Sequence, residues 1–451
     1  MGLSTFMGLE TSLRGLLAQQ QALDTTSHNI ANASTTGYSR QVAVFQASPA
    51  YTIPGVTTAP AGPGQIGTGV DVASYQRIRD AFLDVQYRAQ SMLQGQAQAN
   101  QDGLQQVQLA FNEPTDSGIS SLLSNYWGAW QNLSNNPEDM GTRQALAQSA
   151  ASLADGFQSL SSQLTTLQSQ TAQNVTDQIN QVNNLGTQIA QLNLTISKIT
   201  ATGNSPNDLL DQRDLLVDQL SALGNVAVTN GANGSVDISF GGASLVTAGT
   251  SATLAESDLT SLSAGKIQGL ITLRDTTIPG YQAQLNTIAS ALITKTNAQS
   301  AAGFDLNGNA GGAFFTGTDA TNIAVNPAVI SNPALIAASA TGAVGDAGNA
   351  LRMADMQTTP TIGSATIDAA YTQLVTQVGA DVQQATNQVD TTTALTNALQ
   401  NQRQSVSGVS LDEEMTNLIT FQRGYQASAR ALSAMDDMLD QLINRTGRVG
   451  L

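Results

Sequence analysis

The segment Leu418-Ile-Thr-Phe-Gln-Arg-Gly-Tyr-Gln-Ala-Ser-Ala-Arg-Ala-Leu-Ser-Ala-Met-Asp-Asp-Met-Leu-Asp-Gln-Leu442 carries the clearest structural signal in the chain. Its apolar side chains recur at alternating steps of three and four, which places them in one stripe along a helix. Acidic residues 412–414 precede this stripe, and Arg445 and Arg448 follow it, which is the charge order that a helix dipole favours. The stripe consists of Leu418, Phe421, Tyr425, Leu432, Met435, Leu439 and Leu442.

The opposite end of the chain repeats the pattern. Steps of three and four from Phe6 reach a second set of apolar residues, interrupted by Gln20 and Ser27: Leu9, Leu13, Leu16, Leu23 and Ile30. An isolated helix is marginal in water and cannot bury its own stripe. We therefore expect the terminal helices to pair with each other and with copies from neighbouring subunits. Periodicity alone leaves an ordinary intramolecular bundle core as an equal alternative.

Between the ends, the periodicity changes several times. The Pro- and Gly-rich residues 41–74 predict an extended linker. Helical spacing over 75–223 and again over 264–407 predicts a body of long helices. Residues 224–263 alternate apolar and polar side chains around a Gly/Asn turn, which predicts a β-hairpin excursion. Residues 303–349 are irregular. The overall expectation is a mainly α, elongated fold with a small β-rich part, in which residues 1–40 and 408–451 form a coiled-coil terminal domain.

Composition excludes several classes of function. The 451 residues carry a formal net charge of −16 and contain no Lys/Arg-rich run, so the chain lacks the cationic surface that nucleic acids and anionic membranes require. It has no cysteine, which excludes disulfides and thiolate chemistry. The N-terminus lacks the basic and apolar regions of a cleaved signal peptide, and no apolar run is long enough to span a bilayer.

The sequence contains no set of residues that predicts catalysis or a cofactor. His28 is the single histidine, and neither a Gly-x-Ser-x-Gly elbow nor a His-Glu-x-x-His motif is present. The segment beginning at Asp305 resembles a calcium loop at its first positions, but Ala310 and Thr316 occupy positions that need Gly and Glu, so a plain turn is the better interpretation. We predict no catalytic, cofactor or metal site.

Four short segments carry a family resemblance. Ser27-His-Asn-Ile-Ala-Asn-Ala-Ser-Thr-Thr-Gly-Tyr-Ser-Arg-Gln41 resembles the N-terminal signature of the flagellar rod, hook and hook-associated proteins. Residues 405–414, followed by Phe421-Gln-Arg-Gly-Tyr-Gln-Ala-Ser428, are similar to the C-terminal signature of that family. Residues 67–77 and 205–214 agree as well. The Gly-Tyr-Ser-Arg-Gln ending favours the branch that forms the junction between hook and filament.

The resemblance implies a non-enzymatic subunit of the bacterial flagellum, outside the cell, that is exported through the type III channel without a cleaved signal peptide. It implies assembly through the two terminal stripes, with hinges near Gly37 and Gly408. The expected partners are hook protein, a second junction protein (hook-associated protein 3), copies of the chain in a ring, and a cytoplasmic export chaperone. The chaperone is expected on Leu432, Met435, Leu439 and Leu442.

The family also has a larger outer β domain, which residues 303–349 are too short to contain, so we expect that domain to be reduced or absent. The nearest alternative function is a hook or distal-rod subunit of the same superfamily. An enzyme on a filament-type scaffold and a membrane-active translocator are two more distant alternatives, and the absence of catalytic motifs and of a basic amphipathic face disfavours them.

Overall fold

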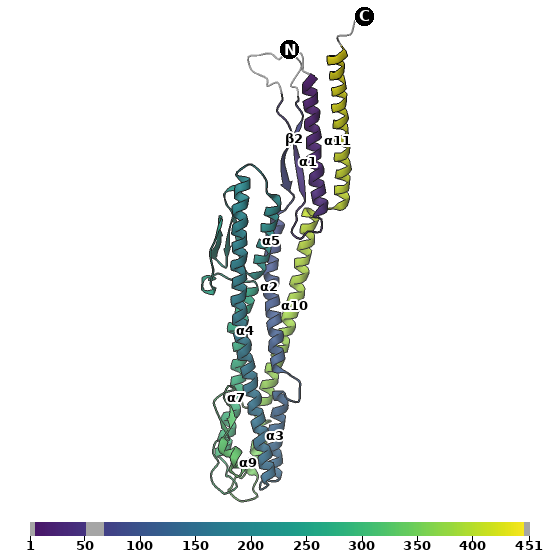
Figure 1. The fold of residues 1–451 in the computed structure, drawn as a ribbon. Helices are drawn as coiled ribbons and strands as arrows, with labels where there is room; N and C mark the ends of the chain where they lie inside the picture. Colours follow the sequence, from purple (N-terminus) through teal and green to yellow (C-terminus); the bar gives the residue numbers. More distant parts are fainter. Residues whose placement is uncertain (1–4, 51–66, 446–451) are drawn as a thin grey trace, which may run out of the picture.

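The computed structural model describes residues 5–50 and 67–445 and shows an elongated, mainly helical molecule (Figure 1). A slender terminal domain lies at one end, and a longer helical body extends from it. This agrees with the predicted mainly α architecture with a small β-rich part. Among the described residues, no helix combines the length and hydrophobicity that crossing a lipid bilayer requires.

The terminal domain contains the two ends of the chain. Helices α1 (Thr5–Ala31) and α11 (Leu411–Asp440) lie side by side in antiparallel orientation (Figure 1). A hairpin of β1 (Gln41–Ala47) and β2 (Val70–Arg77) packs against α1. The prediction of a linker over 41–74 was therefore wrong for both strands. In β1 the buried Gln41 and Ala43 alternate with the exposed Val42, and the prolines start only beyond this strand. Residues 51–66 of that predicted linker lie outside the described residues.

The body is built from long helices, as the periodicity predicted. Helix α2 (Ala81–Phe111) runs beside α10 (Ile367–Ser407), and α3 (Ile119–Asn135) packs on α4 (Met140–Thr200). With 61 residues, α4 is about 90 Å long and spans the whole body. The remaining helices are α5 (Asn207–Leu223), α6 (Lys266–Thr272), the π-helical turn η3 (Leu273–Thr277) and α7 (Ile278–Ala301).

Both hydrophobic cores lie in the body. The larger core, at the end far from the termini, centres on the fully buried Tyr126, Trp127 and Trp130 of α3, with Phe314 and Phe315 packed against them. The second core lies between α4, α5 and the small sheet. Neither core includes a residue of α1 or α11.

The predicted β-hairpin is present and extends further than expected. Strands β3 (Val226–Asn230) and β4 (Val236–Phe240) pair in antiparallel register around a short turn, η1 (Ala232–Gly234), in which Asn233 has φ 52°. The sheet continues through β5 (Ala243–Thr247) to β6 (Thr250–Ser251), giving four strands in chain order. The glycine pair 241–242, both at positive φ, makes the turn that adds the third strand.

The far end of the body contains little β structure. A pair of two-residue strands, β7 (Phe315–Thr316) and β8 (Ala324–Val325), is followed by short helices α8 (Pro327–Ser331), η4 (Pro333–Leu335) and α9 (Gly348–Asp355). The Asp305 carboxylate accepts backbone N–H bonds from Asn307 and Asn309, which closes a tight turn. No larger outer β domain is present in the described residues, in agreement with the expected reduction.

Candidate assembly domain and its joint to the body

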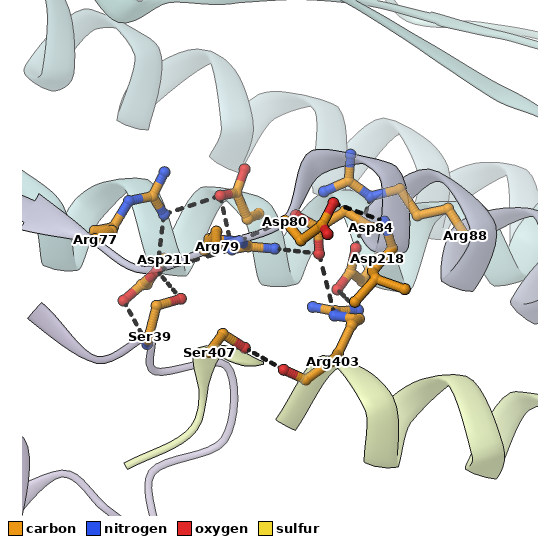
Figure 2. A network of polar contacts seen from close by, with 12 residues as sticks. Ser39, Arg77, Arg79, Asp80, Asp84, Arg88, Asp211, Asp218, Arg403 and Ser407 are labelled. Carbon is orange, nitrogen blue, oxygen red and sulfur yellow. Dashed lines mark hydrogen bonds and ion pairs between the residues drawn. The ribbon is translucent and has the colours of Figure 1, made fainter. Parts of the chain in front are cut away.

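The four signature segments of the sequence converge at one place, the joint between the terminal domain and the body. Figure 2 shows part of this joint, with Ser39, Arg77, Asp211 and Ser407 drawn from four different segments. Backbone bonds cross there as well, because Arg40 N–H donates to Ser407 O and Ile78 N–H donates to Arg40 O. The motifs that are separated by up to several hundred residues in the sequence therefore describe one structural feature.

Asn29 fastens three elements of the terminal domain together. Its side chain is buried, and its Oδ1 accepts from the Tyr38 hydroxyl at 2.8 Å and from Gln41 N–H at 3.0 Å. Its Nδ2 donates to Gln41 O at 2.8 Å and to Glu414 Oε2 at 3.0 Å. A buried amide with both ends fully bonded fixes its neighbours strongly. Asn29 thus sets α1, β1 and the start of α11 relative to one another.

Helix α5 receives the loop that follows α1. Ser39 donates to both oxygens of Asp211, from its backbone N–H at 2.9 Å and from its hydroxyl at 2.8 Å. Gln41 donates to Asp208 at 2.8 Å and accepts from Asn207 at 3.0 Å. These are polar contacts, and they connect the terminal domain to the body where an apolar core is absent.

A buried ion-pair cluster continues from this contact. Arg77 binds Asp211 at 2.7 Å and Asp214 at 2.9 Å, and Arg79 binds Asp214 at 2.8 Å and Asp84 at 2.8 Å. Burial alone would raise the pKa of the Asp214 carboxyl, but the guanidinium groups of Arg79, Arg77 and Arg213 outweigh it and hold that pKa below its usual range. Asp214 therefore stays ionised inside the joint.

Helix α10 joins the same cluster through Arg403. Its guanidinium contacts Asp84 at 3.1 Å and Asp218 at 2.9 Å (Figure 2). It also stacks over the Tyr87 ring at 4.4 Å from the ring centroid. Arg88 completes the set by binding Asp218 at 2.7 Å. One arginine thus holds the last turns of α10 against both α2 and α5.

Sequence reasoning missed this cluster, although a signal was present. Asp208, Asp211, Asp214 and Asp218 recur at steps of three and four, which puts four carboxylates on one face of α5. In a chain with only 11% charged residues, such a row stands out. The arginines that pair with these carboxylates come from distant segments of the chain. Residue spacing within α5 therefore could not predict which arginine binds which carboxylate.

The contact between α1 and α11 is made by small residues on α1. A Cβ placed on Gly8 would lie 2.8 Å from Met435 Cε, and one placed on Gly15 would lie 3.1 Å from Ser428 Oγ. Ala22 and Asn29 continue this line at the same seven-residue interval and are buried. We call Gly8, Gly15, Ala22 and Asn29 the small-residue seam.

The predicted packing residues occupy two different settings. Those of α11 are mostly covered: Leu418, Phe421, Tyr425, Leu432 and Met435 are half-buried, and Leu439 is buried. Met435 meets Gly8 of α1, and Phe421 packs edge-on to the Phe45 ring of β1. Those of α1 lie on a flank beside the seam: Leu9, Leu16, Leu23 and Ile30 are half-buried, while Leu13 and Phe6 are exposed, as is Leu442 beyond the end of α11. The α1 stripe is therefore mostly not the surface that meets α11, because the seam takes its place.

Both terminal helices also present apolar residues on the faces that point away from the seam. On α1 these are Leu13 and Leu17, which are 41% and 47% exposed. On α11 they are Leu411, Met415 and Ile419, which are 54%, 53% and 47% exposed. The α11 row was missed in the sequence, since its residues are four apart and fall between the positions of the predicted stripe.

The two predicted hinge glycines flank the joint, each for its own reason. Gly37 has φ 83°, in the left-handed region that favours glycine, and a Cβ there would touch Leu215. Gly408 has an ordinary φ of −71° and ends α10, where a Cβ would lie 2.3 Å from Gln404 O. Both positions require glycine, one for backbone conformation and one for space.

His28 lies at this joint and not in a reactive cluster. Its ring is 3.3 Å from an Asp208 oxygen and edge-on to the Tyr38 ring. Burial, with the charges of Asp208, Asp211 and Glu414, raises the pKa of the Tyr38 hydroxyl, so that hydroxyl remains a proton donor. Within residues 5–50 and 67–445, no group of three or more His, Asp or Glu side chains is placed to hold a metal ion. The arrangement is suited to holding helices together.

Three family models match separate segments of the chain. Residues 104–315 match the helical domain of the flagellar hook-associated protein FlgK. Residues 9–38 match the flagella basal body rod protein family, and residues 405–445 match the C-terminal segment of the flagellar basal body rod FlgEFG proteins. The ends are therefore similar to a module that rod and hook proteins share, and the body distinguishes the branch.

Whole-chain relatives agree. Flagellar hook-associated protein 1 of Bacillus subtilis is 34% identical, with 98% of this chain and 99% of that protein aligned. Its counterpart in Escherichia coli is 28% identical over 551 aligned positions, covering 97% and 99%. That alignment is longer than the 451 residues of this chain, so the relative has residues that this chain lacks.

One solved structure has the same fold. The flagellar hook junction protein FlgK from Burkholderia pseudomallei superposes with a TM-score of 0.62 at 19% identity, covering 71% of this chain and all of that one. With the full-length identity to the Bacillus protein, the matching helical domain and the two end modules, the chain belongs to the flagellar hook-associated protein 1 family, structural proteins of the bacterial hook–filament junction.

Proposed function

We propose that the chain takes its place in the hook–filament junction by polymerising through its terminal domain, as one of several copies in a ring. The observation that carries the proposal is the pair of exposed apolar faces on α1 and α11, in a domain that belongs to neither hydrophobic core. An apolar helix face that is exposed on a slender domain gains stability when a neighbour covers it.

The body has a different role in this proposal. Its two cores make it a self-contained unit, which faces outwards while the terminal domains pack around the axis. Hook protein on one side and hook-associated protein 3 on the other are the proposed neighbours of the ring. Gly37 and Gly408, beside the polar joint, are the proposed hinges that let body and terminal domain change their relative orientation.

Export precedes assembly in the proposed sequence of events. The chain leaves the cytoplasm through the type III channel without a cleaved signal peptide, and a chaperone covers α11 beforehand. The proposed chaperone residues are Leu432, Met435, Leu439 and Leu442. Met435 meets Gly8 of α1 in the folded chain, and Leu432 and Leu439 are half-buried and buried on the same side of α11, so chaperone and α1 would compete for one surface. Chaperone binding thus requires a chain in which the terminal pair is open.

The proposed role is purely structural. The side chains with perturbed acidity at the joint, such as Asp214 and Tyr38, are engaged with partners inside it, and that supports a function in holding helices. A test is to purify the protein, assay it for hydrolase activity and compare it with His28→Ala. Activity that depends on His28 would contradict a purely structural role.

The decisive experiment is deletion of the gene, followed by electron microscopy and complementation. We expect hooks without filaments and unassembled filament protein in the medium. Ile419→Asp should fail to restore filaments, because it puts a charge on the exposed α11 face. The matched control is Leu109→Asp on the body, where Leu109 is 76% exposed, and it should restore them. Normal filaments in the deletion strain would overturn the proposal.

A further inference from the structure

The exposed faces of α1 and α11 differ in charge as well as in position. The α1 face carries Glu10 one turn before Leu13 and Leu17, and Glu10 is exposed. The α11 face carries Arg423 one turn after Met415 and Ile419, and Arg423 is exposed. Glu10 shares its charge with Arg14 at 2.8 Å, whereas Arg423 forms no ion pair with any residue that the structure describes. The α1 face therefore has a carboxylate at Glu10 that Arg14 shares, and the α11 face has Arg423 at one end and Asp412 at the other.

The two faces point away from the seam, so they lie on opposite sides of the terminal domain. On α1, Leu13 and Leu17 lie about 140–200° around the helix from Gly8 and Gly15, at about 100° per residue. On α11, Met415 and Ile419 lie about 140–180° from Ser428 and Met435, which contact the seam, by the same geometry. Two different surfaces on opposite sides of one subunit can meet only between copies, in a head-to-tail contact that repeats around a ring or a helical array.

The spacing of the two faces matches when the helices run antiparallel. Pairing Glu10 with Arg423 brings Leu13 opposite Ile419, with a mismatch of about 1.5 Å at the 1.5 Å rise per residue. Leu17 then lies opposite Met415 with a similar mismatch. Each apolar residue meets an apolar one, and the opposite charges meet at the end of the contact.

The parallel arrangement is disfavoured by charge. Pairing Leu13 with Met415 and Leu17 with Ile419 in parallel brings Glu10 next to residues 411–412, where Asp412 would repel it. The antiparallel arrangement also follows from the fold, because α1 and α11 are antiparallel within one chain (Figure 1). Copies that share one polarity about the axis present α1 to the next copy's α11 in antiparallel orientation.

Resting on the proposed polymerisation, we propose that the Glu10–Leu13–Leu17 face of α1 binds the Met415–Ile419–Arg423 face of α11 in the adjacent copy, antiparallel and head to tail. Each subunit then uses α11 twice. Its seam-facing side binds α1 of the same chain, and its outer side binds α1 of the next chain.

Disulfide cross-linking tests this contact, and the absence of native cysteine makes every cross-link assignable. A full-length chain with Leu13→Cys and Ile419→Cys is expressed in the deletion strain, and its assembled flagella are oxidised. We expect a ladder of cross-linked multimers, since every subunit contributes one cysteine to each neighbour. The matched control pairs Leu13→Cys with Met438→Cys, which is also exposed but about 28 Å further along α11. It should give at least tenfold less cross-linked product.

Three results would overturn the inference. Dimers from Leu13→Cys alone would indicate a two-fold symmetric contact. More product from Leu13→Cys with Met415→Cys than with Ile419→Cys would indicate the parallel register. Assembled, functional flagella without a ladder would reject this contact and leave the proposed junction role intact, whereas filaments in the deletion strain itself would reject the junction role.

Charge exchange provides a second measurement. Glu10→Arg and Arg423→Glu should each lower the yield of the ladder at least threefold, and the two changes together should restore it, because the attraction is re-formed in reverse. Asp24→Arg is the matched control, since Asp24 is exposed on α1 but lies beyond the start of the opposing helix in this register. Failure of the double exchange to restore the ladder would contradict the Glu10–Arg423 pairing.

Discussion

The body and the terminal domain differ in how they bury the apolar side chains of their helices. The body packs aromatic side chains into two closed cores, with Trp127 and Trp130 almost completely buried. The terminal domain packs two helices across glycine and alanine and leaves several large apolar residues exposed. The difference indicates that the body folds on its own account, whereas the terminal pair is completed by neighbours.

The joint between them resembles neither region. It is held by buried carboxylates and guanidinium groups from α2, α5, α10 and β2, with no apolar core across it. Polar joints of this kind fix one geometry while their partners are satisfied, and removing one partner leaves an uncompensated charge. The following variants test whether the three regions are as independent as the structure indicates.

The largest effect is expected from the core of the body. Trp130→Ala should destabilise the body by about 3–5 kcal/mol, because it leaves a large cavity in the aromatic cluster. Urea unfolding followed by tryptophan fluorescence measures this, since both tryptophans of the chain lie in the body and Trp127 remains as reporter. Leu439→Ala, at the far end of the terminal pair, should leave the same transition unchanged. An equal shift in both variants would mean that the two regions unfold as one.

The next effect is expected at the joint. Arg79→Ala should cost about 3 kcal/mol in opening of the joint, because it leaves Asp214 and Asp84 partly uncompensated. Hydrogen exchange measured by mass spectrometry should show faster exchange in residues 31–41. Arg79→Lys keeps the charge but not the two-pronged geometry, so its effect should be intermediate. Unchanged exchange in Arg79→Ala would show that the hydrogen bonds of Ser39 and Gln41 suffice.

A smaller effect is expected in the seam. Gly15→Leu should push α1 from α11 and cost about 1–2 kcal/mol locally, because Ser428 occupies the space that a larger side chain needs. Exchange should increase in α1 and α11 while the tryptophan-monitored transition of the body stays constant. Gly8→Ala is a milder control, since it meets only the flexible end of Met435. Constant exchange in Gly15→Leu would show that the close approach of the helices is not needed.

The smallest effect concerns pH. Because the pKa of Asp214 is held below its usual value in the folded chain, its contribution to stability is present above about pH 4 and is lost as pH falls through the lowered pKa. Stability of the joint should therefore decline only in strong acid. Asp214→Asn should flatten that decline in hydrogen exchange measured between pH 2.5 and 6. A loss of stability near neutral pH that Asp214→Asn abolishes would contradict this assignment.

Much of the fold was predictable because long helices leave a strong periodic signal. The spacing predicted α4, α10 and α11 and the pairing of β3 with β4, and these are confirmed. The β1–β2 hairpin was missed, since the Pro-rich residues 49–63 between its strands conceal short alternating segments. Its register depends on α1 beneath it, which local sequence does not contain.

The assembly domain was predictable in position but not in detail. Strong apolar spacing on both helices predicted that they pair, yet the contact on α1 uses glycine and alanine, which a search for large apolar residues overlooks. The joint depends on pairs such as Arg403 with Asp84, whose partners are far apart in the sequence. Residue spacing in the sequence predicts which side chains share one face of a helix. Which element packs on that face is determined by the tertiary fold.

The antiparallel course of α1 and α11 has a mechanical consequence. The start of α1 and the end of α11 lie together at the tip remote from the body (Figure 1). Tension between the two ends would therefore separate the helices one contact at a time, beginning near Gly8 and Met435. It would not load all contacts of the seam at once. Each contact along the seam resists separation weakly because the α1 side chains in it are small. The Asn29–Glu414 hydrogen bond, at the opposite end of the pair, would bear the load last. The helix pair thus opens progressively until the separation reaches the polar joint. This protects the body from force applied at the ends of the chain.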